Sequence, residues 1–391
     1  MARTWDAIVV GLGGFGSAAA YWLARRVGSR VLGLERFELG HDRGASADHS
    51  RIIRLSYHRP DYIRLAQRAY ATWADLAADT GSRVVTTTGG LDLFPPGAAI
   101  PEPDYTMSML AEGVPFERLD AADAMRRFPA WQLDDGTSVL YQADAGIADP
   151  FRANEAHRRR ARELGATLLD RTRVTGLREA GGEVDVITED GTTHRAGHVV
   201  IAADAWTNQL LASFDRRLPL TITREQVTYF EAAQPDAFTP DRFPIWIWMD
   251  DPCFYGFPAY GEPGPKAAQD VGGAETTGDS RGFETNEPAL ARLTAFLDRH
   301  LPGMAARELL TKTCLYTLTP DRDFVVDRLP EAPNVTVLLG AAHGFKYASV
   351  LGRIAAELAI DGTTPSADDI AAFRIDRPIL LETAPATSWL V

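Results

Sequence analysis

Three glycines near the start of the chain are the feature that most restricts its fold. Gly11, Gly13 and Gly16 form the pattern G-x-G-x-x-G, directly after the apolar run Asp6–Val10 and before the helix-like segment "FGSAAAYWLARRV". The first glycine permits a tight turn, the second lets a pyrophosphate approach the backbone, and the third allows close packing of helix and strand. An ordinary glycine-rich turn is the alternative interpretation.

The residues after the helix-like segment favour the nucleotide interpretation. The stretch "SRVLGLE" has the composition of a second buried strand, which completes a β-α-β unit with parallel strands. Glu35 closes that strand, where a carboxylate can accept hydrogen bonds from ribose hydroxyls and would repel a 2'-phosphate. The sequence therefore predicts a Rossmann-like, dinucleotide-binding α/β domain.

With 391 residues, the chain exceeds the size at which one core keeps growing, so we expect two domains. The helix-and-strand pattern is interrupted and later resumes, whereas segments such as "TREQVTYFEA" alternate at period two, as antiparallel strands do. We predict an α/β fold of the two-domain α+β kind. Its discontinuous nucleotide domain spans 1–85, 145–217 and 315–391, and its interleaved antiparallel-sheet substrate domain spans 86–144 and 218–314.

The interruption of the nucleotide domain also bears on the cofactor. FAD and NAD both fit a glycine loop of this type. The discontinuous domain and the N-terminal position of the loop favour FAD.

Charge and cysteine content exclude several classes of function. A formal net charge of -13 argues against a general surface for nucleic acid or anionic membranes. The apolar stretch at the start is interrupted by glycines and lacks the pattern of a cleavage site, and no other stretch is long enough to span a membrane. Cys253 and Cys314 are too few for a disulfide framework. We expect a cytoplasmic protein that is a monomer.

A metal site is not expected. His194 and His198 are four residues apart, but they fall in a predicted strand, where that spacing separates side chains by about 13 Å. Such residues cannot share one metal ion.

Several separated motifs, in this order, resemble the monomeric sarcosine oxidase and N-methyltryptophan oxidase family. This family of FAD-dependent amine oxidases lies within the glycine/D-amino-acid oxidase group. The motifs are "GLGGFG", "HSRIIRLSY" at His49 to Tyr57, "YGFPAYGEPGPK" at Tyr255 to Lys266, "KTCLYTLTPDRDF", and "GFK" at Gly344 to Lys346. The resemblance covers nearly the whole chain.

The resemblance implies roles for individual residues. The position of Cys314 corresponds to a cysteine joined to the flavin 8α-methyl group by a thioether. Arg54 and Lys346 correspond to the residues that hold the substrate carboxylate, and Lys266 to the lysine that activates oxygen. Tyr255, which opens its motif, completes the catalytic set. The cofactor contacts expected in this way are Gly11, Gly13, Gly16, Glu35, Arg36, Ser50, Arg51, Val174, Cys314, Gly344, Phe345 and Lys346.

The chemistry of these residue types agrees with those roles, and each has an alternative. Two cations around a carboxylate would fix an α-carbon over a flavin, and a fixed positive charge would stabilise negative charge developing on oxygen. Alternatively, Arg54 belongs to a solvated basic face, Lys346 is exposed, Lys266 occupies a hairpin loop, and Cys314 is a buried structural thiol. His343 lies in the loop predicted beside the flavin and either tunes it or is a satisfied loop histidine.

The chain departs from the family pattern at two positions. Asp270 stands where sarcosine oxidases have a histidine, and Asp204 replaces the glycine of an "AAGAW" turn. Trp246 and Trp248 share one face of a predicted strand, so they either form an aromatic wall for a larger substrate or pack within a sheet.

Together these features predict an FAD-dependent oxidase of a secondary amine that carries a carboxylate, such as an N-methyl or cyclic amino acid. Its partners would be a small amine and oxygen, and its products an imine, hydrolysed by water, and hydrogen peroxide. The alternatives are a flavin- or NAD-dependent dehydrogenase, an oxidase of a larger amine such as a glycated amino acid or a biosynthetic intermediate, and a nucleotide-binding module without catalysis.

Overall fold

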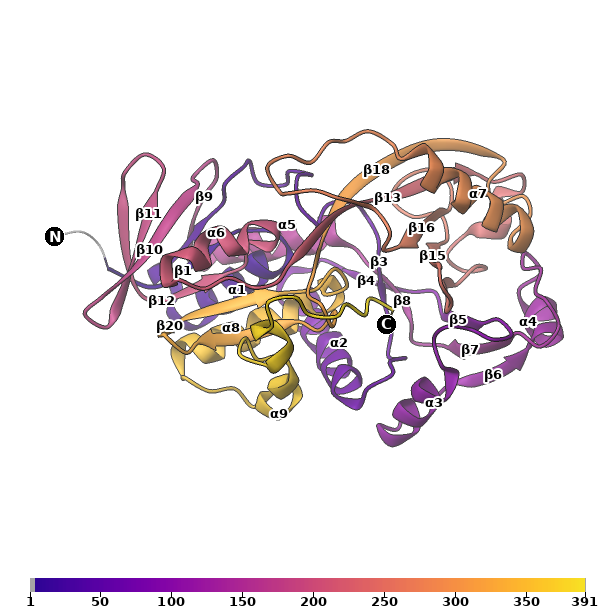
Figure 1. Cartoon of the computed structure of the whole chain (residues 1–391), viewed down its shortest axis with the longest axis horizontal. Helices are drawn as coiled ribbons and strands as arrows, with labels where there is room; N and C mark the ends of the chain where they lie inside the picture. Colours follow the sequence, from indigo (N-terminus) through magenta and orange to yellow (C-terminus); the bar gives the residue numbers. More distant parts are fainter. Residues whose placement is uncertain (1–3, 391) are drawn as a thin grey trace.

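The computed structural model describes residues 4–390, in which two large sheets lie side by side (Figure 1). The first sheet has the strand order β10-β11-β12-β1-β2-β9, with β20 beside β12 and β19 beside β20. Its strands are β1 (Thr4–Val10), β2 (Val31–Leu34), β9 (Thr167–Leu169), β10 (Val174–Ala180), β11 (Glu183–Thr188), β12 (Thr193–Ile201), β19 (Val325–Leu329) and β20 (Ala332–Leu339). The strands β9, β2, β1, β12 and β20 run parallel, as expected for a Rossmann-like sheet.

Helices rich in small residues cover one face of this sheet. The helix α1 (Gly14–Val27) packs between α5 (Pro150–Glu163) and α8 (Ala348–Ile360), and α2 (Pro60–Thr80) packs on α8. At the crossing of α1 and α8, a Cβ on Gly352 would lie 2.6 Å from Ala18 Cβ, so the close approach requires glycine. The short helices α6 (Thr207–Leu211) and α9 (Ala367–Ile370) complete the region.

The second large sheet has the order β17-β13-β16-β15-β14-β5-β7-β6, with β18 beside β13. Its strands are β5 (Gly90–Phe94), β6 (Glu117–Asp120), β7 (Ser138–Gln142), β13 (Thr221–Glu231), β14 (Ile245–Trp248), β15 (Cys253–Phe257), β16 (Lys266–Asp270), β17 (Ala274–Glu275) and β18 (Arg307–Leu318). Its helices are α3 (Glu102–Ala111), α4 (Ala121–Arg127) and α7 (Glu287–His300). A small sheet of β3 (Arg51–Ile53), β4 (Val85–Thr87) and β8 (Gly146–Ala148) connects the two regions.

The predicted fold class is confirmed, with one local difference. The second sheet is antiparallel except where β14 pairs with β5 in parallel. The stretch between Gly113 and Leu140 contains β6, α4 and part of β7. The domain boundaries remain a prediction, and β18 continues in the second sheet past the boundary proposed at residue 314.

The tryptophan pair of β14 faces away from the space between the sheets. Trp246 and Trp248 are buried against Phe296 of α7, whereas Ile247 between them lines the main cavity. The aromatic-wall interpretation is therefore wrong. The period-two pattern correctly predicts that the two tryptophans share one face of the strand. That face is buried in the core because α7 covers it.

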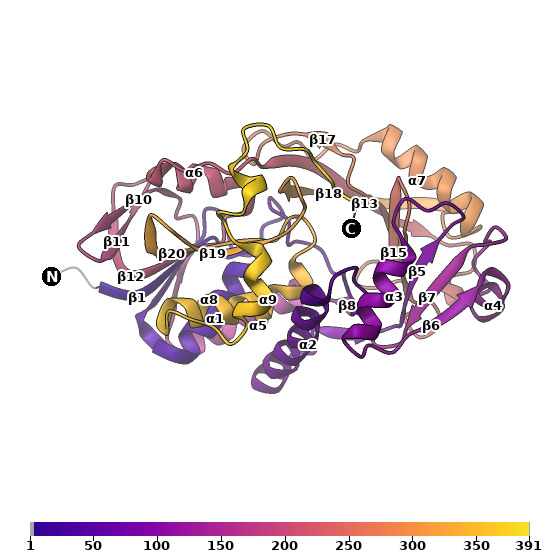
Figure 2. The ribbon, with the colours of Figure 1, turned by 60° about the horizontal axis from the view of Figure 1, so that its bottom comes forward.

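Within residues 4–390 no helix is long and apolar enough to cross a membrane. Figure 2 shows the C-terminal segment passing the helices of the first region and ending between the two large sheets.

Candidate active site

One long cavity runs from the glycine loop into the space between the two large sheets. We call its two parts the nucleotide end and the substrate end. The nucleotide end is lined by Gly11, Gly13, Glu35, Arg36, Val174 and Asp204, and the substrate end by Arg54, His58, Tyr255, Asp270, Arg322, His343 and Lys346. Arg51, Cys314, Gly344 and Phe345 also line the cavity. Of the predicted site residues, Gly16, Ser50 and Lys266 are absent from the lining.

The glycine loop has no space for side chains. Gly11 has a φ of +90°, and a Cβ there would lie 2.5 Å from the carbonyl oxygen of Ala202. A Cβ on Gly16 would lie 1.7 Å from the carbonyl oxygen of Gly11, inside the turn. Gly16 therefore does the packing predicted for the third glycine, while Gly11 and Gly13 present bare backbone to the cavity.

A buried carboxylate completes this end. Glu35 accepts hydrogen bonds from the backbone N–H groups of Leu12 (2.7 Å) and Phe37 (3.0 Å), and His41 lies 3.3 Å away. Burial opposes ionisation, but His41 and the two backbone hydrogen bonds together lower the pKa of Glu35, so the group is an anion facing the cavity.

Unpaired polar atoms show that the nucleotide end fits a polar ligand. Within residues 4–390, Arg36 Nη1 and Asp204 Oδ2 are buried without a hydrogen-bond partner. Buried polar atoms normally find partners, so these two atoms favour a bound polar group. Together with the bare glycine loop and Glu35, they match the phosphates and ribose of FAD.

Asp204 itself is unusual in conformation and charge. Its φ of +46° is left-handed, a conformation that favours glycine, the residue that the resemblance implies at this position. Burial raises the pKa of Asp204 to about 6. The fold thus accepts aspartate in place of glycine at this position of the turn. The side chain there is a carboxyl group that is readily protonated.

Behind the cavity wall, Lys266 forms part of a buried charge cluster. Its ammonium group donates to Asp48 Oδ2 (2.9 Å) and to the Ser50 carbonyl (2.9 Å). Asp48 also accepts from the hydroxyl of Tyr229 (2.7 Å) and from Lys312 (3.1 Å). Burial lowers the pKa of Lys266 to about 8, although Asp48 opposes that effect. The hairpin-loop alternative is wrong, because Lys266 begins β16 and is 1% exposed.

Cys314 lies on β18 and opens onto the cavity near Arg51. Burial raises the pKa of its thiol to about 11, although the positive charge of Arg51 acts in the opposite direction. The thiol is therefore protonated near neutral pH, and Lys312 on the same strand does not produce a thiolate.

At the substrate end, Arg54 is buried in an ion pair and does not belong to a solvated face. It is 5% exposed and bonds to Asp92, which also accepts a hydrogen bond from Ser56. Burial opposes the charged form, but Asp92 raises the pKa of Arg54 above its ordinary value. The Nε atom of Arg54 has no partner within residues 4–390.

Lys346 lies in the short 3-10 helix Phe345–Tyr347, directly before α8. Its ammonium group is 5.6 Å from the centre of the Tyr57 ring, and burial lowers its pKa. Among residues 4–390 no carboxylate lies within 4 Å of this group. Lys346 is thus a partly buried cation that faces the cavity, and none of the described carboxylates pairs with it.

Tyr255 lies on β15, and its hydroxyl is 3.4 Å from that of Tyr316. Burial raises the pKa of Tyr255, so the phenol stays protonated. The structure thus places an uncharged hydroxyl pair at the substrate end.

Three partners of these groups were not predicted. Asp48 holds Lys266, Asp92 holds Arg54, and Arg322 holds Asp270 through two contacts of 2.8 and 2.9 Å. Asp48 directly precedes the motif "HSRIIRLSY" and has a φ of +84°, but its sequence neighbours do not reveal its partners. Arg322 lies within "TPDRDF", where its positive charge is the one sequence feature that could indicate a role in the site.

No group of three metal-ligating side chains occurs in the described part of the chain. His198 is bonded to Thr336 (2.8 Å), consistent with its place in β12.

Comparison with known proteins agrees with this arrangement. Residues 6–358 match the FAD dependent oxidoreductase family. The chain is 36% identical to a monomeric sarcosine oxidase of Streptomyces avermitilis over 372 residues, covering 93% of this chain and 96% of the relative. It is 31% identical to an N-methyl-L-tryptophan oxidase of Yersinia pestis over 384 residues, covering 95% and 99%.

Among solved structures, the open form of NikD, "an unusual amino acid oxidase essential for nikkomycin biosynthesis", has a TM-score of 0.84 at 28% identity. It covers 95% of this chain and 97% of that one. The predicted resemblance is confirmed by these relatives. From its glycine loop to its helix α8, the chain belongs to the family of FAD-dependent oxidoreductases.

Proposed function

We propose that this enzyme oxidises a secondary amine that carries a carboxylate, namely an N-methyl or cyclic amino acid, to an imine that water hydrolyses, and that oxygen is reduced to hydrogen peroxide. The observation that carries the proposal is the partly buried cation Lys346, which lies near Arg54 at the end of a cavity that begins at the FAD-type glycine loop. No carboxylate among residues 4–390 forms an ion pair with it. The names of the relatives support the amine class.

FAD, when bound, supplies the electron acceptor that no side chain provides. The bare backbone at Gly11 and Gly13 would hold its phosphates, Glu35 its ribose, and Val174 would lie at the adenine. Arg36 and Asp204 offer the unpaired polar atoms described above. Ser50, Arg51, Gly344 and Phe345 belong to the segments that would surround its ring system.

The substrate carboxylate would bind to Lys346 and to the Nε–H of Arg54, neither of which has a partner of this kind in the described part of the chain. Asp92 binds Nη1 of Arg54 and so fixes the orientation of the guanidinium group. A substrate carboxylate bound to the Nε side of this group would therefore hold the substrate α-carbon in one position. The neutral hydroxyl of Tyr255 would border the amine.

Lys266 would provide positive charge for the reduction of oxygen. It does not line the cavity, so its charge would act from behind Arg51. Replacing Lys266 with methionine should slow the reaction with oxygen and leave anaerobic reduction by the amine unchanged. A variant that consumes oxygen as fast as the parent would remove this role.

We further propose that Cys314 is joined to the flavin by a thioether. Acid precipitation of the purified enzyme should leave the yellow colour in the pellet for the parent and for Cys253→Ser, and release it for Cys314→Ser. Cys253 is a matched control because it also lines the cavity. Colour in the supernatant of the parent would end this assignment and leave the amine chemistry intact.

The function is tested by peroxide formation with N-methyl amino acids, pipecolate and proline, each beside the corresponding amine without its carboxylate. Peroxide should form with at least one of the acids and much more slowly with its decarboxylated counterpart. Flavin-loaded enzyme that produces peroxide with none of these compounds would overturn the proposal. Slow reoxidation in air after anaerobic reduction would instead indicate a dehydrogenase.

We also propose that the enzyme is a cytoplasmic monomer. The two free cysteines suit a reducing compartment, and the charge of -13 disfavours anionic partners. Light scattering of the flavin-loaded enzyme, with an expected mass near that of one chain, tests the oligomeric state.

A further inference from the structure

A second ion pair at the substrate end has no part in the proposed reaction. Asp270 ends β16, and Arg322 lies in the turn between β18 and β19. Arg322 Nη1 lies 2.8 Å from one oxygen of Asp270, and Nη2 donates to the other at 2.9 Å. Both residues line the cavity, and the charge of Asp270 acts on Lys346.

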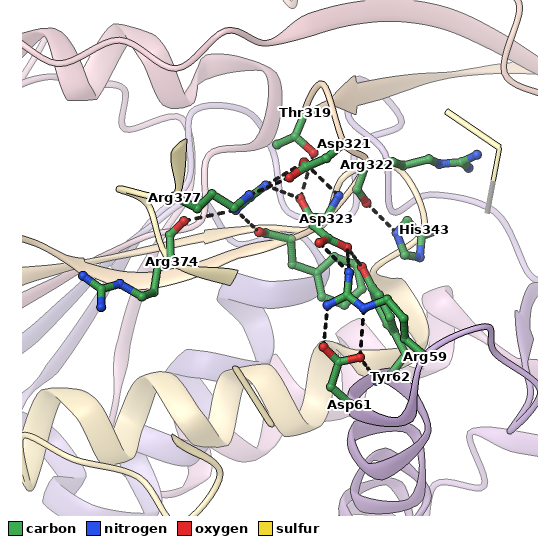
Figure 3. A network of polar contacts seen from close by, with 11 residues as sticks. Arg59, Asp61, Tyr62, Thr319, Asp321, Arg322, Asp323, His343, Arg374 and Arg377 are labelled. Carbon is green, nitrogen blue, oxygen red and sulfur yellow. Dashed lines mark hydrogen bonds and ion pairs between the residues drawn. The ribbon is translucent and has the colours of Figure 1, made fainter. Parts of the chain in front are cut away.

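The backbone around Arg322 is fixed from several sides (Figure 3). His343 lies 2.9 Å from the Arg322 carbonyl, Asp323 binds Arg59 and Tyr62, and Asp321 binds Arg377. Figure 3 shows the guanidinium group of Arg322 pointing away from this network. Arg322 also has a left-handed φ of +57°, a conformation that a non-glycine residue keeps only when its surroundings enforce it. The turn therefore holds this cation at the cavity.

The guanidinium group has more donors than Asp270 uses. Nη1 also bonds to the carbonyl of Trp389 from the C-terminal segment. Nε is buried and has no hydrogen-bond partner among residues 4–390, and the residue is 2% exposed. Without Asp270, Arg322 would offer a cationic fork of the kind that binds carboxylates.

The charges at the substrate end otherwise cancel in pairs. Arg54 is compensated by Asp92, and Arg322 by Asp270. His58 and His343 are neutral, because burial lowers the pKa of each. Lys346 therefore supplies the one uncompensated charge among the described residues that define this end.

We propose that the Asp270–Arg322 ion pair makes the site select amines with one carboxylate over amines with two. Asp270 binds the Arg322 guanidinium group, which would otherwise be available to bind a second carboxylate of the substrate. This inference rests on the proposed function and adds Asp270 and Arg322 as specificity residues.

The test uses acids that cannot be oxidised, so that binding is measured without turnover. Flavin absorbance is titrated with butyrate and with succinate, glutarate and adipate, in the parent, Asp270→Ala, Arg322→Met and the double variant. Glu275→Ala, an exposed carboxylate of β17, is the control. In Asp270→Ala, the best diacid should gain about tenfold or more relative to butyrate, because a buried charged hydrogen bond becomes available.

The other variants should respond differently. In Arg322→Met, Asp270 is left without its cation, so both kinds of acid should bind more weakly. The double variant removes both charges and should bind butyrate within about threefold of the parent, because paired charges that are removed together leave little net effect. If Asp270→Ala does not retain flavin, the double variant and Arg322→Met decide the question.

A ratio of diacid to butyrate affinity that stays constant in Asp270→Ala would overturn the proposal, as would a tenfold loss of butyrate binding in the double variant. Failure of the proposed function gives a different result. In that case butyrate does not perturb the parent flavin, or no amine is oxidised, although the variants retain normal flavin spectra.

Discussion

The two ends of the cavity bind charge in different ways. At the nucleotide end, the phosphate-binding groups are backbone of one short loop, exposed because Gly11 and Gly13 lack side chains, and Glu35 follows them closely in the chain. At the substrate end they are ionised side chains such as Arg54, Arg322 and Lys346, which come from distant parts of the chain. The nucleotide end therefore depends on local shape, whereas the substrate end depends on which charges are left unpaired.

The strongest test of the nucleotide end is Gly16→Ala. Alanine normally stabilises a helix relative to glycine by about 1 kcal/mol, but here its Cβ would overlap the Gly11 carbonyl. We expect a loss above about 4 kcal/mol in the free energy of unfolding, together with loss of flavin. Urea unfolding and flavin absorbance measure both effects.

The control for this change is Gly176→Ala in β10, where the nearest atom to a new Cβ is 3.9 Å away. That variant should retain flavin. If Gly16→Ala retains it equally well, the overlap is relieved by backbone movement, and the nucleotide end is less rigid than described.

Asp204 gives the nucleotide end one charge-dependent feature. Its pKa rises from an ordinary 3.8 to about 6, so the folded state retains a proton that the unfolded state has lost. The contribution of Asp204 to stability is complete below pH 3.8, falls as pH rises through 6, and is then constant. The total difference is about 3 kcal/mol.

Asp204→Asn should remove this contribution, so the variant should gain stability over the parent as pH rises from 4 to 7. Urea unfolding at a series of pH values measures the difference. Asp215→Asn is the control, because Asp215 also has a left-handed φ (+52°) but is exposed. A difference that does not change with pH would refute the titration of Asp204 in this range.

The substrate end is tested by Lys346→Met. Loss of a buried charged hydrogen bond of about 1.5–3 kcal/mol should lower kcat/KM for the amino acid by about 10- to 100-fold. The same variant should oxidise the amine without a carboxylate as well as the parent does. Steady-state kinetics on both compounds make the comparison, and equal losses on both would show that Lys346 acts on something other than the carboxylate.

The smallest expected effect concerns the C-terminal segment. The backbone N–H of Ser388 donates to the Pro320 carbonyl at 2.8 Å, and the Trp389 carbonyl accepts a hydrogen bond from Arg322. A chain that stops after Thr387 should lose about 1 kcal/mol of stability and show a KM raised about threefold, with kcat unchanged. A chain that stops after Leu390 keeps the peptide carbonyl of Trp389 and should behave as the parent, and equal behaviour of both shortened chains would show that these contacts do not position Arg322.

The contrast between the nucleotide end and the substrate end explains which features could be predicted from the sequence. The unit β1-α1-β2 is local, since its glycines, apolar periodicity and Glu35 lie within the first 35 residues, and the structure confirms it. Cys314, Arg54 and Lys346 follow from a resemblance, and the structure brings them to one cavity. Their catalytic roles remain proposals.

The pairing of charges could not be predicted in this way. Arg54 and Asp92 are 38 residues apart, and Lys266 and Asp48 are 218 apart. Such pairs form because burial penalises an isolated charge, and burial depends on the whole fold. The same limit applies to Trp246, whose strand pattern is clear but whose covering helix, α7, comes much later in the chain.

The contact between Trp389 and Arg322 has a consequence for biosynthesis. A nascent chain presents the glycine loop almost at once, but β20, which pairs with β12 in the first sheet, follows more than a hundred residues after β12. At the substrate end, the contact of Arg322 with Trp389 forms later still. The nucleotide end can therefore begin to form during translation, whereas the substrate end is completed only after residue 389 has left the ribosome.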